Sequence, residues 1–157
     1  MEARYEGTRE AEKMIRRAKV SDVSEMNHLR LQVRENMLSD PSIITREMTI
    51  DSITASGRGW VFEEQGRILG FSIALDEDPS IWAMFVLPGH EGHGIGHALH
   101  EAAVNWLWSR GADLIWLGTD PGTRAERFYR DRGWQEAGKH DNGEIHFELR
   151  RPAQPAR

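Results

Sequence analysis

The segment Val86-Leu87-Pro88-Gly89-His90-Glu91-Gly92-His93-Gly94-Ile95-Gly96 decides the fold of this chain, because it joins a strand-like run to an amphipathic helix. The run from Ile81 to Leu87 is apolar at every position, which is typical of a strand covered on both faces at the centre of a sheet. Three glycines at alternate positions allow a tight turn, and the unpaired N–H groups of the helix that follows point into it. Such amides favour a phosphate or pyrophosphate as the ligand.

Hydrophobic periodicity predicts the other elements on both sides of this segment. Upstream we expect a strand over 14–18, a helix with a capping-box-like start at Asp22 and Glu25 that runs to Met37, a break at 39–42, a helix over 45–53, and hairpin strands over 60–63 and 68–74. Downstream we expect a helix from Ile95 with a stripe of Leu99, Ala102, Ala103 and Trp106, a strand over 114–117, a helix over 123–132, and two closing strands, the last at 144–149.

This order of elements predicts an α/β fold, a mixed α+β sandwich. We expect about six to seven strands in a central, mixed, mostly antiparallel twisted sheet that is flanked by about four helices. At 157 residues the chain fits a single core. We expect a flexible N-terminal arm at 1–12, one domain at 13–150 and a flexible C-terminal tail at 151–157.

Composition excludes several classes of chemistry. The absence of cysteine excludes disulfides, thiolate metal sites and a cysteine nucleophile. The formal net charge of −5 argues against a nucleic-acid partner, which needs clustered lysine and arginine. An anionic ligand is still allowed, because backbone amides at a helix start bind anions without carrying a formal charge. No apolar stretch is long enough for a membrane span, so we expect no membrane contact and a cytoplasmic location.

Two other interpretations of the glycine segment compete with an anion-binding site. A glycine-rich turn by itself is often only a surface loop that needs positive φ angles. A dinucleotide-binding Rossmann unit would also place a strand before the glycines and an acid, here Asp120, after the next strand. The G-x-G-x-G spacing, the four residues between Leu87 and Gly92, and the hairpin upstream count against a Rossmann unit.

The sequence resembles the GNAT family of acetyl-CoA-dependent N-acetyltransferases in two motifs and in the order of its elements. The residues that carry the resemblance are Val86, Pro88, 91–96, Ala98 and Leu99 in the acyl-CoA motif, and Ala125, Phe128, Tyr129, Gly133 and Trp134 in the downstream motif. The resemblance implies the GNAT fold, acetyl-CoA as cofactor and an amine-bearing acceptor substrate. It also implies that strands 81–87 and 114–117 splay apart to hold the cofactor.

The resemblance further implies roles for individual residues. The backbone around Gly92 to Gly96 would bind the pyrophosphate, the backbone of Phe85 and Val86 would pair with the pantetheine arm, and Tyr129 would lie near the thioester sulfur. The implied cofactor-binding residues are Phe85, Val86, Glu91, Gly92, His93, Gly94, Ile95, Gly96, His97, Ala125 and Phe128. Arg124, beside this motif, would either reach a cofactor phosphate or be simply exposed.

Four positions depart from the family's pattern. Glu91 stands where the family usually has glutamine or arginine, and we expect its side chain to point outward because the motif acts through amides. Gly122 replaces a frequent asparagine, while His93 and His97 replace frequent lysine or arginine. Since histidine gains charge near pH 6.5, we hypothesise that affinity for acetyl-CoA rises below about that pH.

A metal site is the alternative interpretation of the histidines. His93, His97 and His100 can share a helical face, a spacing that metal ligands also use. However, two of the rings lie where the anion is expected, and no supporting carboxylate can be assigned. We therefore predict no metal.

Acetyl transfer needs a deprotonated amine, a polarised carbonyl group and a proton for the leaving thiolate. We expect a strand N–H near Phe85 or Val86 to bind the carbonyl oxygen and Tyr129 to supply the proton, in a direct attack within a ternary complex. The alternative for Tyr129 is a core residue with its hydroxyl at the surface.

The general base and the acceptor are not defined by the sequence. Glu35, Asp76 and Glu144 fall on the acceptor side by topology, although solvated surface carboxylates fit the same pattern, and Trp82 stands where some relatives carry a carboxylate. A non-catalytic acyl-CoA-binding sensor or interaction module on the same fold is the alternative function. Exposed tryptophans at 82, 106 or 108 would favour a homodimer.

Overall fold

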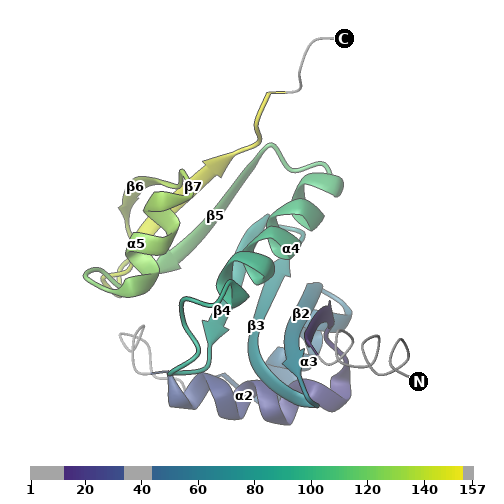
Figure 1. Cartoon of the computed structure of the whole chain (residues 1–157). Coiled ribbons are helices and arrows are strands. Elements are labelled where there is room, and N and C mark those ends of the chain that lie inside the picture. The colour runs from purple at the N-terminus through teal and green to yellow at the C-terminus, as the bar shows by residue number, and fades with distance from the viewer. Residues whose placement is uncertain (1–12, 34–43, 154–157) are drawn as a thin grey trace.

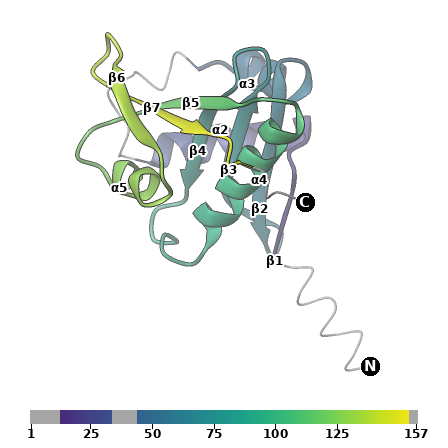
Figure 2. The same cartoon turned by 90° about the horizontal axis from the view of Figure 1, so that it is seen from above.

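Seven strands form one sheet in the order β1-β2-β3-β4-β5-β7-β6 in the computed structural model, which describes residues 13–33 and 44–153 (Figures 1 and 2). The strands are β1 (Lys13–Arg17), β2 (Gly57–Glu64), β3 (Arg67–Leu75), β4 (Ser80–Val86), β5 (Leu114–Thr119), β6 (Gln135–Lys139) and β7 (Ile145–Arg150). The helices in these ranges are α2 (Val23–Gln32), preceded by the 3-10 turn η1 (Val20–Asp22), α3 (Arg46–Thr54), α4 (Ile95–Ser109) and α5 (Arg124–Asp131). The predicted fold class is confirmed.

The centre of the sheet contains its one parallel pair. All other neighbouring strands are antiparallel, whereas β4 runs parallel to β5. Within the described ranges these two strands pair only at Ser80 and Trp116, and beyond this point they diverge (Figure 1). The splay implied by the family resemblance is therefore present, and it leaves one backbone edge of β4 without a strand partner.

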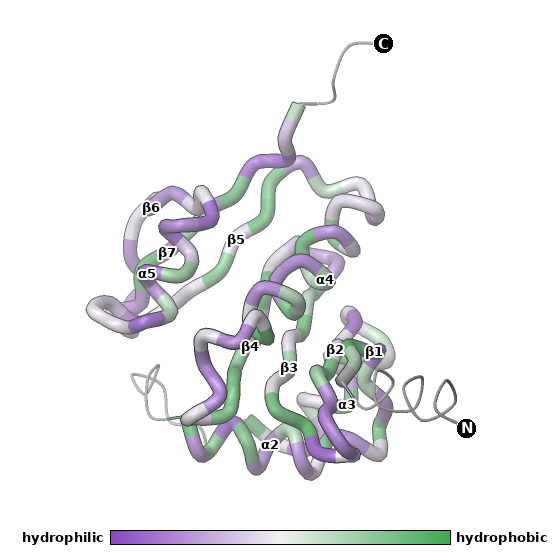
Figure 3. Tube along the Cα trace, in the orientation of Figure 1, coloured by the Kyte–Doolittle hydropathy of each residue, from purple (hydrophilic) through white to green (hydrophobic). Residues whose placement is uncertain are grey.

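Helices cover both faces of the first half of the sheet. The Ser72 hydroxyl on β3 donates to the Leu99 carbonyl of α4 at 3.0 Å, so Ser72 faces α4. Its neighbour Phe71 lies beside Arg30 of α2, on the opposite face, as the alternation along a strand requires. We call these the α4 face and the α2 face. The apolar stretches of β3 and β4 run between the two layers (Figure 3).

β5, β7 and β6 form the second half of the sheet, which α5 covers. Ile115 and Leu117 of β5 are buried together with Leu107 of α4 and Tyr129 of α5. Side chains alternate along a strand, so Trp116 points away from this core. Trp116 therefore lies on the α2 face of the continuous sheet.

The buried stripe of α4 differs from the predicted one. Ile95 and Leu99 are buried as predicted, but near the end of the helix Leu107 is buried while Trp106 is only half-buried. Trp106 packs sideways against Trp60, with ring centroids 5.9 Å apart. Its ring is large enough to reach β2 from the edge of the helix, so the smaller side chain takes the core position.

The prediction did not place β6. All five of its residues are exposed, so no apolar alternation marks the strand, and only its pairing with β7 at the sheet edge defines it. The predicted helix end at Met37, the break at 39–42, the arm at 1–12 and the last residues of the tail, 154–157, lie outside the described residues.

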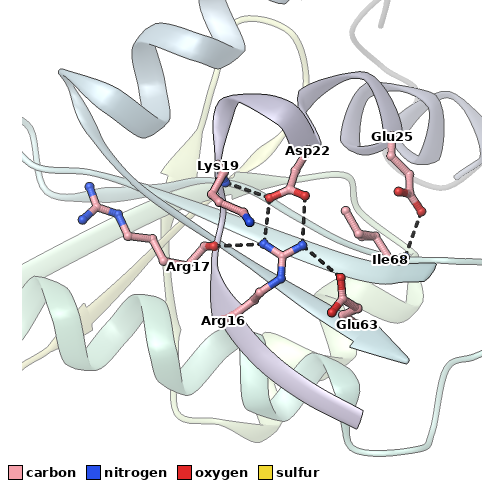
Figure 4. A network of polar contacts seen from close by, with 7 residues as sticks. All are labelled: Arg16, Arg17, Lys19, Asp22, Glu25, Glu63 and Ile68. Atoms are coloured by element: carbon pink, nitrogen blue, oxygen red, sulfur yellow. Dashed lines mark hydrogen bonds and ion pairs between the residues drawn. The ribbon is translucent and has the colours of Figure 1, made fainter. Parts of the chain in front are cut away.

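A network of charged side chains ties β1 to η1 and β2 (Figure 4). Arg16 donates two hydrogen bonds to Asp22, at 2.8 and 2.9 Å, and one to Glu63 at 3.0 Å. Asp22 also accepts the Lys19 N–H at 2.7 Å, and its side chain is buried. A two-pronged contact between guanidinium and carboxylate is among the stronger charged pairs, so this network holds β1 at the sheet edge.

The expected capping box at the start of α2 is wrong in its contacts. Asp22 occupies the N-cap position, but its side chain makes no bond to the first turn of the helix. Glu25 reaches away from the helix and accepts the Ile68 N–H at 2.8 Å (Figure 4). Asp22 and Glu25 therefore bind donors of other segments, including Arg16 and the Ile68 N–H, rather than the N–H groups of the first turn of α2.

Replacing Asp22 by asparagine should lower the free energy of unfolding by about 2 kcal/mol, because the Arg16 guanidinium loses its charged acceptor. Hydrogen bonds from Arg16 and from the Lys19 N–H lower the pKa of Asp22, against burial, which raises it. The contribution of Asp22 is therefore complete above about pH 4 and is lost as the pH falls through its lowered pKa. Urea unfolding between pH 7 and pH 2 measures this loss. Asp141→Asn, at an exposed carboxylate, is the control, and equal losses at pH 7 would contradict the prediction.

Candidate functional site

A groove of about 660 Å³ opens where β4 and β5 diverge. It is bounded by the end of β4, by residues 87–94, which we call the glycine loop, by the first turn of α4 and by α5. The predicted site residues that line it are Phe85, Val86, Glu91, Gly92, Gly94, Gly96, His97, Ala125, Phe128 and Tyr129. His93 is exposed and Ile95 is buried, and neither lines the groove.

Gly92 and Gly94 hold the glycine loop in a backbone conformation that other residues rarely adopt. Both have a φ of +82°, and Gly94 is the N-cap residue of α4. A Cβ atom at either position would meet no atom within 4 Å, so the space beside them is open. The loop therefore presents the N–H groups at the start of a 15-residue helix to an open groove, an arrangement suited to an anion.

Close packing fixes the first turn of α4. Ile95 is buried beside Gly70 of β3, where a Cβ atom would lie 3.1 Å from it. A Cβ atom at Gly96 would lie 3.3 Å from the Phe128 ring, so glycine there lets α5 approach α4. Ile95 consequently anchors the helix start through its side chain and can meet a ligand only through its backbone.

Glu91 does not point outward as expected. Its carboxylate turns back onto the glycine loop and accepts the Gly89 N–H at 2.9 Å. A hydrogen bond from its own N–H lowers the pKa of Glu91 most, and the Gly89 N–H lowers it further, against burial, which raises it. The carboxylate thus occupies one amide of the glycine loop.

Tyr129 lies at the inner wall of the groove with 5% of its surface exposed. Its ring packs edge-on against Phe128 and Trp134, with centroids 5.4 and 5.7 Å away. Burial raises the pKa of the Tyr129 phenol well above its usual range, so the hydroxyl stays protonated at neutral pH. A protonated hydroxyl in the wall of a groove can act as a proton donor.

Arginines of α5 and its C-terminal end also line the groove. These are Arg124, Arg127 and Arg132, of which the sequence interpretation had considered Arg124 alone. The Arg132 guanidinium lies 3.5 Å from the centroid of the Phe128 ring. The arginines at 124, 127, 130 and 132 in the sequence could have indicated a positively charged groove wall. Of these, Arg130 pairs with Glu126 instead. Three arginines against the two carboxylates Glu91 and Asp131 leave the groove with a small positive charge in an acidic protein.

The histidines considered as metal ligands do not converge. His97 lines the groove and His93 is exposed outside it, whereas His100 is buried at 3% exposure. The Trp134 indole N–H donates to His100 Nε2 at 2.9 Å, and His100 Nδ1 lies 2.8 Å from Glu101 Oε2. Nδ1 therefore carries the proton. In the described parts of the chain, no three side chains of metal-binding type lie close enough to hold an ion.

The carboxylates considered as general bases have different environments. Asp76 forms a 2.8 Å ion pair with Arg110, at the end of α4 opposite to the glycine loop. Glu144 accepts the Asn142 side-chain N–H at 3.1 Å, and a Cβ atom at Gly118 would lie 2.8 Å from its Oε1. Glu144 thus borders β5, whereas Glu35 lies outside the described residues.

A row of polar side chains on the α2 face of β5 and β7 escaped the sequence interpretation. His146 Nδ1 lies 3.0 Å from His140 Nε2, and its Nε2 lies 3.3 Å from Glu148 Oε2. The Trp116 ring stacks on His146 with centroids 5.2 Å apart. His140 and His146 flank the turn before β7, and the pairing of β5 with β7 brings Trp116 beside them.

Comparisons with known proteins agree with this geometry. A model of the acetyltransferase (GNAT) family matches residues 24–134. An uncharacterized N-acetyltransferase of Mycobacterium tuberculosis is 32% identical over 74 residues, which are 45% of this chain and 47% of the relative. The peptidyl-lysine N-acetyltransferase YiaC of Escherichia coli is 33% identical over 84 residues, 54% of each chain. The matches thus span about half the length of these curated relatives.

The fold is also found in solved structures. The crystal structure of the PaiA N-acetyltransferase from Thermoplasma acidophilum in complex with coenzyme A superposes with a TM-score of 0.74, covering 88% of this chain and 99% of that one. The two sequences are 14% identical, so this likeness concerns the fold.

Replacing His100 by glutamine should flatten the dependence of stability on pH. Burial lowers the pKa of His100 below 6.5, while Glu101 raises it less, so the unfolded chain binds the proton first. The stability contributed by the neutral ring is complete above about pH 6.5 and declines as the pH falls toward the lowered pKa. Urea unfolding between pH 8 and pH 5 should show this decline in the wild type and in His28→Gln, an exposed control, but not in His100→Gln. An unchanged slope in His100→Gln would refute it.

Proposed function

The chain belongs to the acetyltransferase (GNAT) family, and on that basis we propose that it moves an acetyl group from acetyl-CoA to a primary amine of a small molecule or protein. The observation that carries the proposal is the groove between β4 and α5, which joins the N-terminus of α4 to Tyr129. In this proposal the amine attacks the thioester directly while both substrates are bound.

The residues present fit coenzyme A. The open space beside Gly92 and Gly94 admits a diphosphate next to the first amides of α4, and Arg124 and Arg127 add positive charge at the same end. The β4 edge at Phe85 and Val86 offers backbone groups that β5 does not use. Acetyl-CoA, when bound, would supply the activated acetyl group as a thioester, and the chain would hold it in position. Of the predicted binding residues, Ile95 and His93 contribute at most their backbone.

The chemistry assigned to the chain is positioning and proton supply. A backbone N–H of β4 near Phe85 or Val86 binds the acetyl oxygen as it gains negative charge. Tyr129, whose hydroxyl is protonated at neutral pH, would give its proton to the departing sulfur and regain one from solvent. The amine loses its proton on the side of the sheet away from the cofactor, where Glu144 and the His140–His146 row lie.

The acceptor and the biological setting belong to the same proposal. None of the described helices has the length and apolar character to cross a membrane, and a cytoplasmic location is proposed. A homodimer stays a prediction. The exposed tryptophans that would favour it are not found, since Trp82, Trp106 and Trp108 are each half-buried. The hypothesis that charge on His93 and His97 strengthens binding now depends on His97, which alone of the two lines the groove.

A screen of amines with acetyl-CoA tests the proposal. Release of free thiol that depends on the acceptor, with an acetylated product in the mass spectrum, is the expected result. Tight binding of acetyl-CoA without transfer to any amine or peptide would instead favour the acyl-CoA-binding sensor on the same fold.

Gly94→Ala should weaken acetyl-CoA binding about tenfold, because a methyl group and a strained backbone would stand at the start of α4. Gly66→Ala, in the β2–β3 hairpin, is the matched control, since its φ is also positive and its Cβ atom would also meet open space. Both variants should lose about 1 kcal/mol of stability. Titration calorimetry measures the affinities, and equal weakening in both variants would show that the loop has no special role.

Tyr129→Phe should lower kcat at least tenfold with less than a twofold change in the Kd of acetyl-CoA, because it removes the proton donor and keeps the ring. Steady-state kinetics and calorimetry separate the two quantities, and thermal unfolding checks that the ring cluster with Phe128 and Trp134 persists. Turnover equal to that of the wild type would remove the acid role and leave Tyr129 as a core residue.

A further inference from the structure

Arg30 is a buried cation on the α2 face of the sheet. It lies two residues before the end of α2, with 9% of its surface exposed. Its guanidinium carbon lies 5.2 Å from the ring centroids of Trp82 and Phe85 and 5.7 Å from that of Phe71. The three aromatic rings of β3 and β4 thus surround one positive charge.

The charge of Arg30 is not compensated within the described part of the chain. Its Nε and one terminal nitrogen are buried and have no hydrogen-bond partner there. Burial alone lowers the pKa of Arg30 to about 10, with no carboxylate raising it. Buried charges in proteins are normally paired, and cation–π contacts replace only part of the lost hydration. A guanidinium that has two nitrogens without a partner among the described residues is therefore suited to bind an anion from outside the chain.

The position of Arg30 relates this ring cluster to the groove. Phe85 contacts Arg30 and also lines the groove, and Val33, one turn after Arg30 on the same side of α2, lines it too. The glycine loop and α5 approach the groove from the α4 face, where the proposed cofactor lies. Arg30 stands on the other face of β4, the side from which a second substrate can reach the splay.

We propose that Arg30 binds a carboxylate of the acceptor, so that the acceptor is a small amine that also carries a carboxylate group, such as an amino acid. This inference rests on the proposed acetyl transfer. The planar fork of guanidinium matches a single carboxylate, and Trp82 and Phe85 offer apolar contact to the part of the acceptor that joins its two charged ends. The amine of such a compound then lies toward the splay, between Arg30 and Glu144.

Matched pairs of amines that differ only in the carboxylate test this assignment. The pairs are L-phenylalanine with 2-phenylethylamine, L-leucine with 3-methylbutylamine, and L-lysine with 1,5-diaminopentane. For at least one pair, kcat/KM should be at least tenfold higher for the carboxylate-bearing member, mainly through a lower KM, because hydrogen bonds to charged groups contribute this much discrimination.

Variants of Arg30 identify the group responsible. Arg30→Met and Arg30→Gln should abolish the preference within each pair, and Arg30→Lys should restore part of it. Comparison with the wild type cancels the difference in amine pKa between the members of a pair. Arg58→Met is the matched control. Arg58 is half-buried, its Nε also lacks a hydrogen-bond partner among the described residues, and its guanidinium lies 5.5 Å from the ring of Trp106 on the α4 face. Arg58→Met should keep the preference.

A binding measurement separates this inference from the proposed function. In the presence of coenzyme A, N-acetyl-L-phenylalanine should bind the wild type at least tenfold more tightly than N-acetyl-2-phenylethylamine, and Arg30→Gln should bind both equally. Failure to acetylate any amine counts against the proposed function. Transfer that ignores the carboxylate, or equal binding of the two N-acetyl compounds to the wild type, overturns the role of Arg30 and leaves acetyl transfer intact.

Discussion

The single pairing of Ser80 with Trp116 between β4 and β5 is the constraint on which the site depends. A parallel pair normally continues along both strands, and here it stops after one step, so that two halves of one sheet lean apart. The separation leaves backbone groups of β4 free and makes room for a groove with one end at the start of α4 and the other at Tyr129. Without this divergence, β5 would cover the edge of β4 at which the proposed chemistry takes place.

Each side of the splay has its own electrostatic character. On the α4 face, an acidic protein obtains a basic groove from uncharged amides and from arginines of α5, while the Glu91 carboxylate occupies one amide of the same loop. On the α2 face, Arg30 stands among aromatic rings, and two of its nitrogens have no partner among the described residues. A buried cation without a counter-charge lowers the free energy of unfolding. Residues that lower stability in this way are typical of binding sites.

Several contacts show how tertiary structure overrules a local pattern. Asp22 and Glu25 have the spacing of a capping box, yet each binds a donor from another element, and this choice connects β1, α2 and β3. Trp106 fits the predicted stripe of α4, yet Leu107 takes the core position because the larger ring reaches Trp60. In both cases a side chain contacts a residue of another element instead of the local partner that the sequence pattern predicts.

By itself, the sequence determined the glycine loop, the hairpin, the start of α4 and the family motifs, because backbone limits at glycine and hydrophobic periodicity act within a few residues. It also pointed to most residues of the groove, since these follow one another along β4, the loop and α5. Only the tertiary structure decided that Arg30 meets Trp82 and Phe85, and that Trp116 stacks on His146. Those contacts depend on strand order and register across the sheet, which no pattern within a single segment encodes.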